Sequence, residues 1–377
     1  MKKLVALLLV LCMAVALSAC GASQSAPAAE QSAPAAQEAP AAEEAPAAEE
    51  APAAESEAAP QPTVDFPKKP ITVIVPYSAG GSCDLTTRQL AVLMEKELGQ
   101  SITVVNQGGS SGSIGIQACL DADPDGYTMV MTADSLGTMR VMGLSDSISY
   151  DDFATITAVI NDPKTIVVGK DSPYNTLEDL FNDMSARPGK VKMSYTGPGG
   201  SGHVQSLILN AMGYDMALTA YAGGSDSLLA VLNGSVDFTN ANYSTVIDHL
   251  ASGNLKCLAV CATDRIAALP DVPAITELYP EAEAYLRFPF CPYILQVRND
   301  VDPQIVEILR DAARKAMATD EWKTYVENTC QEKLYEKYPT QEDVYSFMKG
   351  FESLVSWMLY DAGATQFSPE DFNIPRP

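Results

Sequence analysis

The stretch ITVIVPYSAGGSCD at residues 71–84 decides the fold of this chain. It begins with a β-branched apolar run at residues 71–75, continues through turn-forming residues, and leads into an amphipathic run at residues 85–98. This order predicts a strand, a small-residue loop and a helix. Gly80 and Gly81 can take positive φ values and let a ligand approach the backbone closely.

The start of this predicted helix is a candidate anion site. Ser82 or Asp84 is the expected N-cap. The N–H groups of a first helical turn are unpaired and lie at the positive end of the helix dipole, so they can hold a carboxylate. We interpret the loop as one half of a carboxylate-binding cleft. An ordinary strand-to-helix turn is the alternative that this stretch leaves open.

Length and charge restrict the class of protein. The chain has 377 residues, which suggests about two domains. Its net charge of −24 argues against binding nucleic acid, whose phosphates would be repelled. Small anions are not excluded, because local dipoles decide binding in a cleft. No CxxC motif or Cys/His cluster points to a metal, and no cofactor is expected.

The N-terminus has the pattern of an export signal. Lys2 and Lys3 precede an apolar run at residues 4–17 that is too short to span a bilayer, and no later run is long enough. The sequence LSAC, ending at Cys20, resembles a bacterial lipobox. It implies removal of residues 1–19 and a lipid on the Cys20 thiol, which holds the protein at a membrane surface. A plain signal peptide with a chance cysteine is the alternative.

Residues 20–65 are expected to be a disordered tether that starts at the lipidated cysteine. Repeats of APAAE dominate this segment, and they offer little to bury. Six cysteines follow it, and we expect buried free thiols. Cys257 and Cys261 lie about 13 Å apart in a probable strand, too far to form a disulfide. The six are Cys83, Cys119, Cys257, Cys261, Cys291 and Cys330.

Strand and helix patterns alternate from Phe66 onward. Further strands are expected at residues 102–105, 127–132, 165–169, 190–195, 236–240 and 255–262, and helices at residues 114–122, 177–184, 204–212, 228–233, 303–318, 321–330 and 341–362. This alternation predicts α/β units with mostly parallel, doubly wound sheets. Ligands bind beyond the carboxyl ends of the strands in such sheets.

A second glycine-rich loop, TGPGGSGH at residues 196–203, again follows a strand and opens a helix. Two α/β units with such loops predict a hinged, two-lobe binding protein that closes around a ligand. We expect residues 66–164 to form the first part of lobe 1, residues 165–290 to form lobe 2, and residues 291–377 to return to lobe 1.

Several stretches together resemble the receptors of tripartite tricarboxylate transporters, the TctC or Bug family. They occur in order from Phe66 to the C-terminus: PKKPITVIVPYSAGGSCD, PDGYTMVMT, TGPGGSGH, YAGG and LKCLAVCATDRIAALPDVPAITE. The resemblance implies a periplasmic-binding-protein fold of type II, with a ligand cleft between two lobes. It implies an extracytoplasmic receptor, expected to be monomeric and not an enzyme, that delivers a small carboxylate to membrane transporter subunits. A lipoprotein that senses a ligand for a signalling partner, or a secreted hydrolase, is the alternative.

The resemblance also implies the ligand-binding residues, mostly through backbone N–H groups. For Asp84, a capping role is weighed against contact with an amino group on the ligand. The residues are Tyr77, Ser78, Ala79, Gly80, Gly81, Ser82, Asp84, Ala133, Asp134, Ser135, Thr196, Gly197, Gly199, Gly200, Ser201, His203, Tyr221, Asn240 and Asn242.

Two departures from the family pattern bear on the ligand. Gln107 stands after Asn106 where family members carry arginine, and Ala222 follows Tyr221 where they carry lysine or arginine. Two positive charges near the cleft are therefore missing. This favours a monocarboxylate, a dicarboxylate or an amino acid over a tricarboxylate such as citrate.

Two motifs point weakly to enzymes. Residues 197–202 match the spacing of a dinucleotide fingerprint, but Pro198 lies in the turn and the chain is exported. Residues 108–112 match G-x-S-x-G, which a Gly/Ser-rich loop also produces by chance. A hydrolase triad would need His203 or His249 beside that serine.

Overall fold

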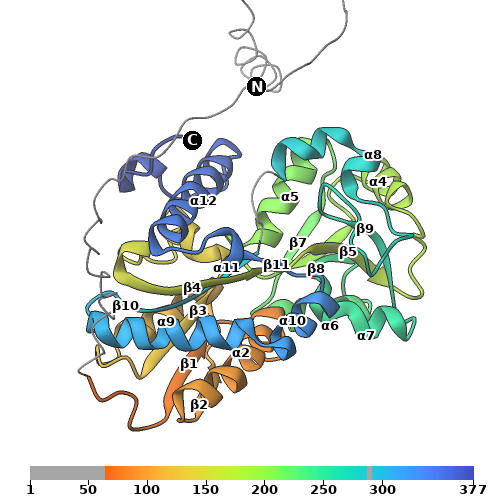
Figure 1. The fold of residues 1–377 in the computed structure, drawn as a ribbon. Helices are drawn as coiled ribbons and strands as arrows, with labels where there is room; N and C mark the ends of the chain where they lie inside the picture. The colour runs from red at the N-terminus through yellow and green to blue at the C-terminus, as the bar shows by residue number, and fades with distance from the viewer. Residues whose placement is uncertain (1–63, 287–290) are drawn as a thin grey trace, which may run out of the picture. The chain divides into compact units, whose positions relative to one another are not determined.

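The computed structural model describes residues 64–286 and 291–377. The predicted signal segment, Cys20 and nearly all of the tether lie outside these ranges. Within them, the strands form two separate sheets with helices packed around each (Figure 1). None of the helices in these ranges is both long and apolar enough to cross a membrane.

The first sheet, sheet A, has the strand order β11-β4-β10-β3-β1-β2. β1 pairs with β2 and β3 in parallel, and β10 pairs antiparallel with β3 and β4. The bounds are β1 (Ile71–Val75), β2 (Ile102–Asn106), β3 (Thr128–Thr132), β4 (Phe153–Asn161), β10 (Pro292–Arg298) and β11 (Glu332–Lys333).

The second sheet, sheet B, has the order β7-β6-β8-β5-β9. β6 is parallel to β7 and β8, whereas β5 is antiparallel to β8 and β9. The bounds are β5 (Lys164–Gly169), β6 (Lys192–Tyr195), β7 (Ala217–Ala220), β8 (Phe238–Asn242) and β9 (Leu255–Val260).

The predicted α/β class is correct, but the expectation of mostly parallel sheets is wrong. Four of the described pairings are parallel and five are antiparallel. The physical reason lies in the crossovers. Only Asp162 and Pro163 separate β4 from β5, so the chain enters sheet B at the end where β6 and β8 finish. β10 enters sheet A in the same reversed sense. Neither β4 nor β10 was predicted.

The helices cover the sheets. The expected α5 began at residue 204, but the helix starts at Ser201, and α6 also starts earlier than expected. The α-helices are α2 (Ser82–Leu98), α3 (Ser113–Leu120), α4 (Leu177–Ala186), α5 (Ser201–Ala211), α6 (Gly224–Leu232), α7 (Tyr243–Ala251), α8 (Ile275–Leu278), α9 (Pro303–Ala318), α10 (Asp320–Asn328), α11 (Leu334–Lys337) and α12 (Gln341–Asp361). The 3₁₀ turns are η1 (Ser110–Gly112), η2 (Asp134–Thr138), η3 (Tyr150–Asp152), η4 (Pro280–Tyr285) and η5 (Pro369–Phe372).

Helix α9 shows why the C-terminal third is helical. Asp302 caps it by accepting from the Gln304 N–H at 2.8 Å, and Pro303 fills the first position, as predicted. Its buried face includes Leu309 and Ala313. This face packs in the same core as α2, which runs beside α9 (Figure 1).

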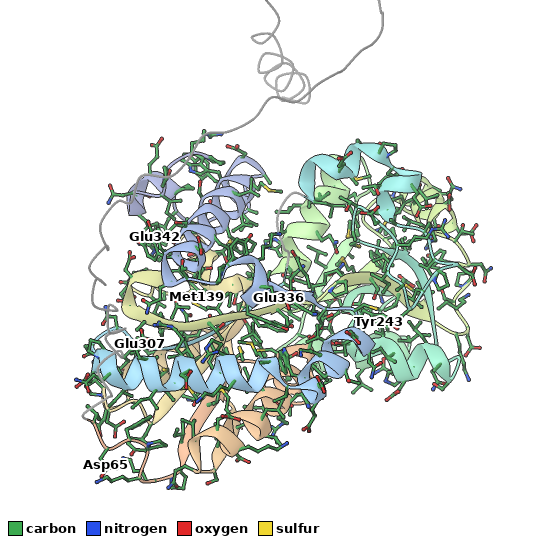
Figure 2. The ribbon with its side chains drawn as sticks, in the orientation of Figure 1. Asp65, Met139, Tyr243, Glu307, Glu336 and Glu342 are labelled. Carbon is green, nitrogen blue, oxygen red and sulfur yellow. The ribbon has the colours of Figure 1, made fainter. Side chains whose placement is uncertain are left out.

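Each sheet has its own apolar core. Ile71, Met131 and Leu295 belong to one core on sheet A, and Phe181 and Phe238 belong to a core on sheet B. Side chains fill the space around both sheets (Figure 2). Separate cores are what two lobes require. They support the proposed division of the chain at residues 164 and 290, which remains a prediction.

A buried ion cluster braces η2, the turn that follows β3. Glu352 on α12 is 2 % exposed and forms ion pairs with Arg140 at 2.7 Å and with Lys349 at 2.6 Å. Nearby, the Ser356 hydroxyl donates to Gly137 O at 3.1 Å. These contacts fix η2 against α12.

We expect Glu352→Ala to lower the free energy of unfolding by about 3 kcal/mol, because it leaves the largely buried Arg140 charge unpaired. Urea denaturation measures this change. The control is Glu321→Ala, which removes an exposed pair with Lys96 and should cost at most about 1 kcal/mol. Equal losses in the two variants would show that the cluster does not brace η2.

Candidate functional site

The loop after β1 delivers the start of α2. Gly80 has φ +75°, as its predicted freedom requires, but Gly81 has φ −77° and needs no such freedom. The expected N-cap was wrong: Gly81 is the cap, and Ser82 is the first helical residue. No group in the described ranges accepts from the N–H of Ser82 or Cys83, and both residues are buried. The start of α2 therefore carries backbone N–H donors that have no hydrogen-bond acceptor in the described ranges.

Asp84 holds this loop in shape. Its carboxylate accepts from Gly80 N–H at 2.8 Å and from the Asn106 amide at 2.9 Å, and it pairs with Arg88 at 2.9 Å. Burial opposes ionisation of Asp84, but Arg88 and the N–H donors outweigh burial and lower its pKa. Asp84 supports the loop from behind and does not line the cavity described below.

The start of α5 is satisfied differently. Gly200 is its N-cap, and the Ser201 N–H donates to the Asp134 carboxylate, which comes from η2 beside the other sheet. The Thr138 hydroxyl donates to Gly199 O at 2.9 Å. A carboxylate of the protein itself thus occupies the site where sequence reasoning placed the carboxylate of a ligand.

The two lobes also meet at the start of α6. The Ser78 hydroxyl donates to the Asp226 carboxylate, and the Ser225 hydroxyl donates to Ala79 O at 2.9 Å. A Cβ built on Gly223 would lie 2.7 Å from the Ser78 backbone N. The approach of the two loops therefore requires glycine at this position.

A small cavity of about 40 Å³ lies between these helix starts. It has room for roughly three water molecules. Several predicted site residues line it: Tyr77, Gly81, Ser82, Ala133, Asp134, Thr196, Ser201 and Asn242. The two glycine-rich helix starts therefore share one hollow, as the sequence predicted.

The other predicted site residues do not line this cavity. Ser135 bonds the Tyr77 hydroxyl at 2.7 Å, and Tyr221 N–H donates to Tyr195 O at 2.8 Å. The remaining ones outside the lining are Ser78, Ala79, Gly80, Asp84, Gly197, Gly199, Gly200, His203 and Asn240.

Sequence reasoning missed Lys164, the first residue of β5. It lines the cavity and is 5 % exposed. Its Nζ donates to Asn242 Oδ1 at 2.7 Å, and no described carboxylate pairs with it. The only signal was a lysine directly before the apolar run TIVV. Gln107 and Ala222 stand where the family pattern has positive residues, but Lys164 gives the cleft a positive charge. The other lining residues missed are Cys83, Gly224, Cys291 and Tyr293.

The site is equipped for binding. Burial raises the pKa of the Asp134 carboxyl, while the charge of Lys164 and hydrogen bonds from Ser201 oppose this rise. Burial also raises the pKa values of the Cys83 and Cys291 thiols, which makes them poor nucleophiles. No cluster that could hold a metal ion occurs in the described part of the chain.

The enzyme motifs do not assemble a catalytic group in the described structure. Ser110 is exposed, and no hydrogen bond joins it to His203 or His249. His203 Nδ1 instead accepts from Gly199 N–H at 3.1 Å. The loop of the fingerprint motif packs against Thr138 of the other lobe.

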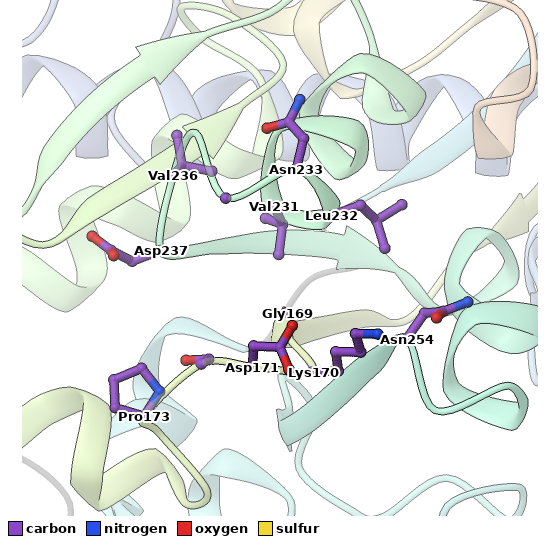
Figure 3. Close-up of a pocket in the computed structure, with 12 residues that line it drawn as sticks. Gly169, Lys170, Asp171, Pro173, Val231, Leu232, Asn233, Val236, Asp237 and Asn254 are labelled. Atoms are coloured by element: carbon purple, nitrogen blue, oxygen red, sulfur yellow. The ribbon is translucent and has the colours of Figure 1, made fainter.

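A larger hollow of about 490 Å³ lies elsewhere, between the turns at residues 169–173 and 233–237 (Figure 3). It is at the opposite end of β5 from Lys164, roughly 17 Å away at the rise of a strand. No start of a long helix lines it. The cavity between the lobes is therefore the better candidate site.

The crossover between β4 and β5 contains a buried network of polar groups. Asp162 is 1 % exposed and accepts from the hydroxyls of Ser82 and Ser244 and from the Gln331 amide. Burial raises the pKa of this carboxyl, which these hydrogen bonds oppose. Tyr243, labelled in Figure 2, lies at the start of α7 and donates its N–H to Pro163 O at 2.8 Å. All six described cysteines are free, and Cys257 and Cys330 are half-buried.

Two sheets with separate cores, joined by crossovers around a polar cavity, define a two-lobe fold of the periplasmic-binding-protein type. Solved structures share this fold. The periplasmic binding protein BugD matches with a TM-score of 0.72 and 24% identity over 80% of this chain and 99% of that one. MatC from Rhodopseudomonas palustris, solved with bound malate, matches with a TM-score of 0.70 and 20% identity over 78% of this chain and all of that one.

The sequence comparisons identify the family. Residues 86–348 match the tripartite tricarboxylate transporter family receptor, TctC. BugT of Bordetella pertussis is 30% identical over 265 residues, which cover 69% of this chain and 80% of BugT. A UPF0065 protein of Cupriavidus necator is 31% identical over 258 residues, which cover 67% and 76% of the two chains. The chain belongs to the TctC/Bug family of solute-binding receptors, as the sequence motifs predicted.

Closure of the lobes should depend on Gly223. We expect Gly223→Ala to hold the lobes further apart, because its methyl group would overlap the Ser78 backbone. Small-angle X-ray scattering would show a larger radius of gyration. Gly224→Ala is the matched control, since a Cβ there meets nothing within 4 Å. Identical scattering from both variants would contradict the close approach of these loops.

His203 should make stability depend on pH. Burial lowers its pKa below the ordinary value of 6.5. The unfolded chain therefore binds the proton more readily, and stability is lost as the pH falls below 6.5. Between pH 7.5 and 5.5, wild type should lose more stability than His203→Gln, measured by urea denaturation. An equal loss in both proteins would contradict this assignment.

Proposed function

We propose that this protein is an extracytoplasmic receptor that binds a small carboxylate between its lobes and delivers it to the membrane subunits of a tripartite tricarboxylate-type transporter. The observation that carries the proposal is the set of hydrogen-bond donors in the cavity that lack a described acceptor. Ser82 and Cys83 contribute free N–H groups at the start of α2, and Lys164 contributes an ammonium with one hydrogen bond. Such donors suit a carboxylate.

Two structures of the same fold support this ligand class. MatC was solved with malate, and a second Rhodopseudomonas palustris protein was solved with adipate, at a TM-score of 0.70 and 22% identity. Both ligands are small dicarboxylates. They show that this architecture holds such molecules in other proteins.

The mechanism follows from the two-lobe geometry. With the lobes apart, the start of α2 and Lys164 are open to a solute. A carboxylate that reaches both contacts residues on the two lobes at once, so it binds the closed arrangement more tightly and shifts the population toward it. The bonds from Ser201 to Asp134 and from Thr138 to Gly199 add to the closed arrangement. The membrane subunits would then recognise the closed receptor.

The proposal includes the place of the receptor in the cell. Export, cleavage before Cys20 and lipidation of that cysteine would leave the receptor tethered to a membrane surface. It would act as a monomer, because one chain supplies both halves of the cavity.

Ligand binding should raise thermal stability without turnover. We expect small carboxylates, with malate and adipate among the first to be tested, to stabilise the protein, by about 2.7 kcal/mol at 100 times the dissociation constant. Thermal unfolding measures this shift. NAD and simple esters are the negative controls. Ester hydrolysis that disappears in Ser110→Ala would contradict a receptor.

Gly81→Val should block binding and leave the fold intact. The backbone at Gly81 suits any residue, and its Cβ would lie 3.3 Å from Ser78 O and 3.8 Å from Gly224 N. The added methyl groups would occupy the wall of the cavity beside the free N–H groups. Calorimetry should show at least a tenfold loss of affinity, with unchanged circular dichroism. Normal binding would show that the ligand lies elsewhere.

A further inference from the structure

The charges in the cavity narrow the class of ligand. Among the described lining residues, Asp134 and Lys164 are the ones with formal charges at neutral pH. They come from opposite lobes, Asp134 from η2 beside sheet A and Lys164 from β5 of sheet B. They do not form an ion pair with each other. The cavity therefore presents one negative and one positive group to whatever it encloses.

The Lys164 ammonium has hydrogen-bond donors without a partner among the described residues. An ammonium has three N–H donors, and this one spends a single donor on Asn242 Oδ1. Because the residue is 5 % exposed, water reaches it poorly. The charge of Lys164 acts on Asp134, but no described carboxylate forms an ion pair with Lys164, so its remaining donors are open to an anionic group of a ligand. The free N–H groups of Ser82 and Cys83 line the same cavity. Together they define the place of a carboxylate.

Asp134 is the matching acceptor. It is 6 % exposed and accepts from Ser201 N–H. A carboxylate has about four lone-pair sites, so it can accept from a further donor. A second carboxylate on the ligand would bring like charges together in a low dielectric, which is unfavourable. A cationic group would instead pair with Asp134.

Building on the proposed function, we infer that the ligand is an amino acid, whose carboxylate meets Lys164 and the start of α2 and whose ammonium meets Asp134. A zwitterion leaves the closed cavity with no net charge, whereas a dicarboxylate leaves two uncompensated negative charges.

The test uses pairs of ligands that differ by one amino group, with the full chain as the receptor. The probes are L-alanine with propionate, L-aspartate with succinate and L-glutamate with glutarate, extended to the other L-amino acids and their deaminated acids. Calorimetry gives the dissociation constants. We expect at least one amino acid to bind at least tenfold more tightly than its deaminated partner.

Two variants assign the charges. Asp134→Asn should remove the preference for the amino acid, so that the two dissociation constants of a pair come within about threefold of each other. The ratio is the readout, because this variant also alters a contact of the closed arrangement. Lys164→Met should weaken both members of a pair by about tenfold or more. Asp171→Asn and Lys170→Met, at the far end of β5, are the matched controls and should change neither constant. Circular dichroism checks the fold of each variant.

The outcomes distinguish failure of the amino-acid inference from failure of the proposed function. If a dicarboxylate or monocarboxylate binds as tightly as its amino acid, or if Asp134→Asn keeps the preference, the amino-acid inference is overturned and the receptor for a carboxylate stands. If neither member of any pair binds, while thermal unfolding shows no shift with malate or adipate, the proposed function itself fails.

Discussion

The first N–H groups of a helix have no carbonyl partner within that helix, and this constraint organises the site. At the start of α5 an aspartate from the opposite lobe satisfies Ser201. At the start of α2 the N–H groups of Ser82 and Cys83, in a buried cavity, have no acceptor within residues 64–286 and 291–377. One helix start thus holds the lobes together, and the other remains available to a ligand. The difference arises from Asp134, which lies on η2.

A buried carboxylate at the crossover joins several elements. Asp162 gathers two helix starts and a C-terminal segment around one carboxylate, with donors from Ser82, Ser244 and Gln331. Lys164 follows two residues later and enters the cavity. The strand that begins directly after this crossover therefore carries a residue of the cavity wall.

Local patterns in the sequence predicted much of the fold. The capped start of α9 at Asp302 and the strand–loop–helix from Ile71 needed only neighbouring residues, so they were found. β4 and β10 were missed because their apolar residues alternate only weakly and no glycine-rich loop follows either strand. The reversed direction of β5 was missed because the direction of a strand within a sheet depends on partners distant in the chain.

The sequence by itself determined the family and the two glycine-rich helix starts, because these features are written in consecutive residues. Only the tertiary structure decided which groups face the ligand. It buried Lys164 beside Asn242, placed Asp134 on the start of α5, and turned Asp84 away to brace its own loop. The charge of a cavity is a sum over residues from separate lobes, and no local pattern encodes that sum.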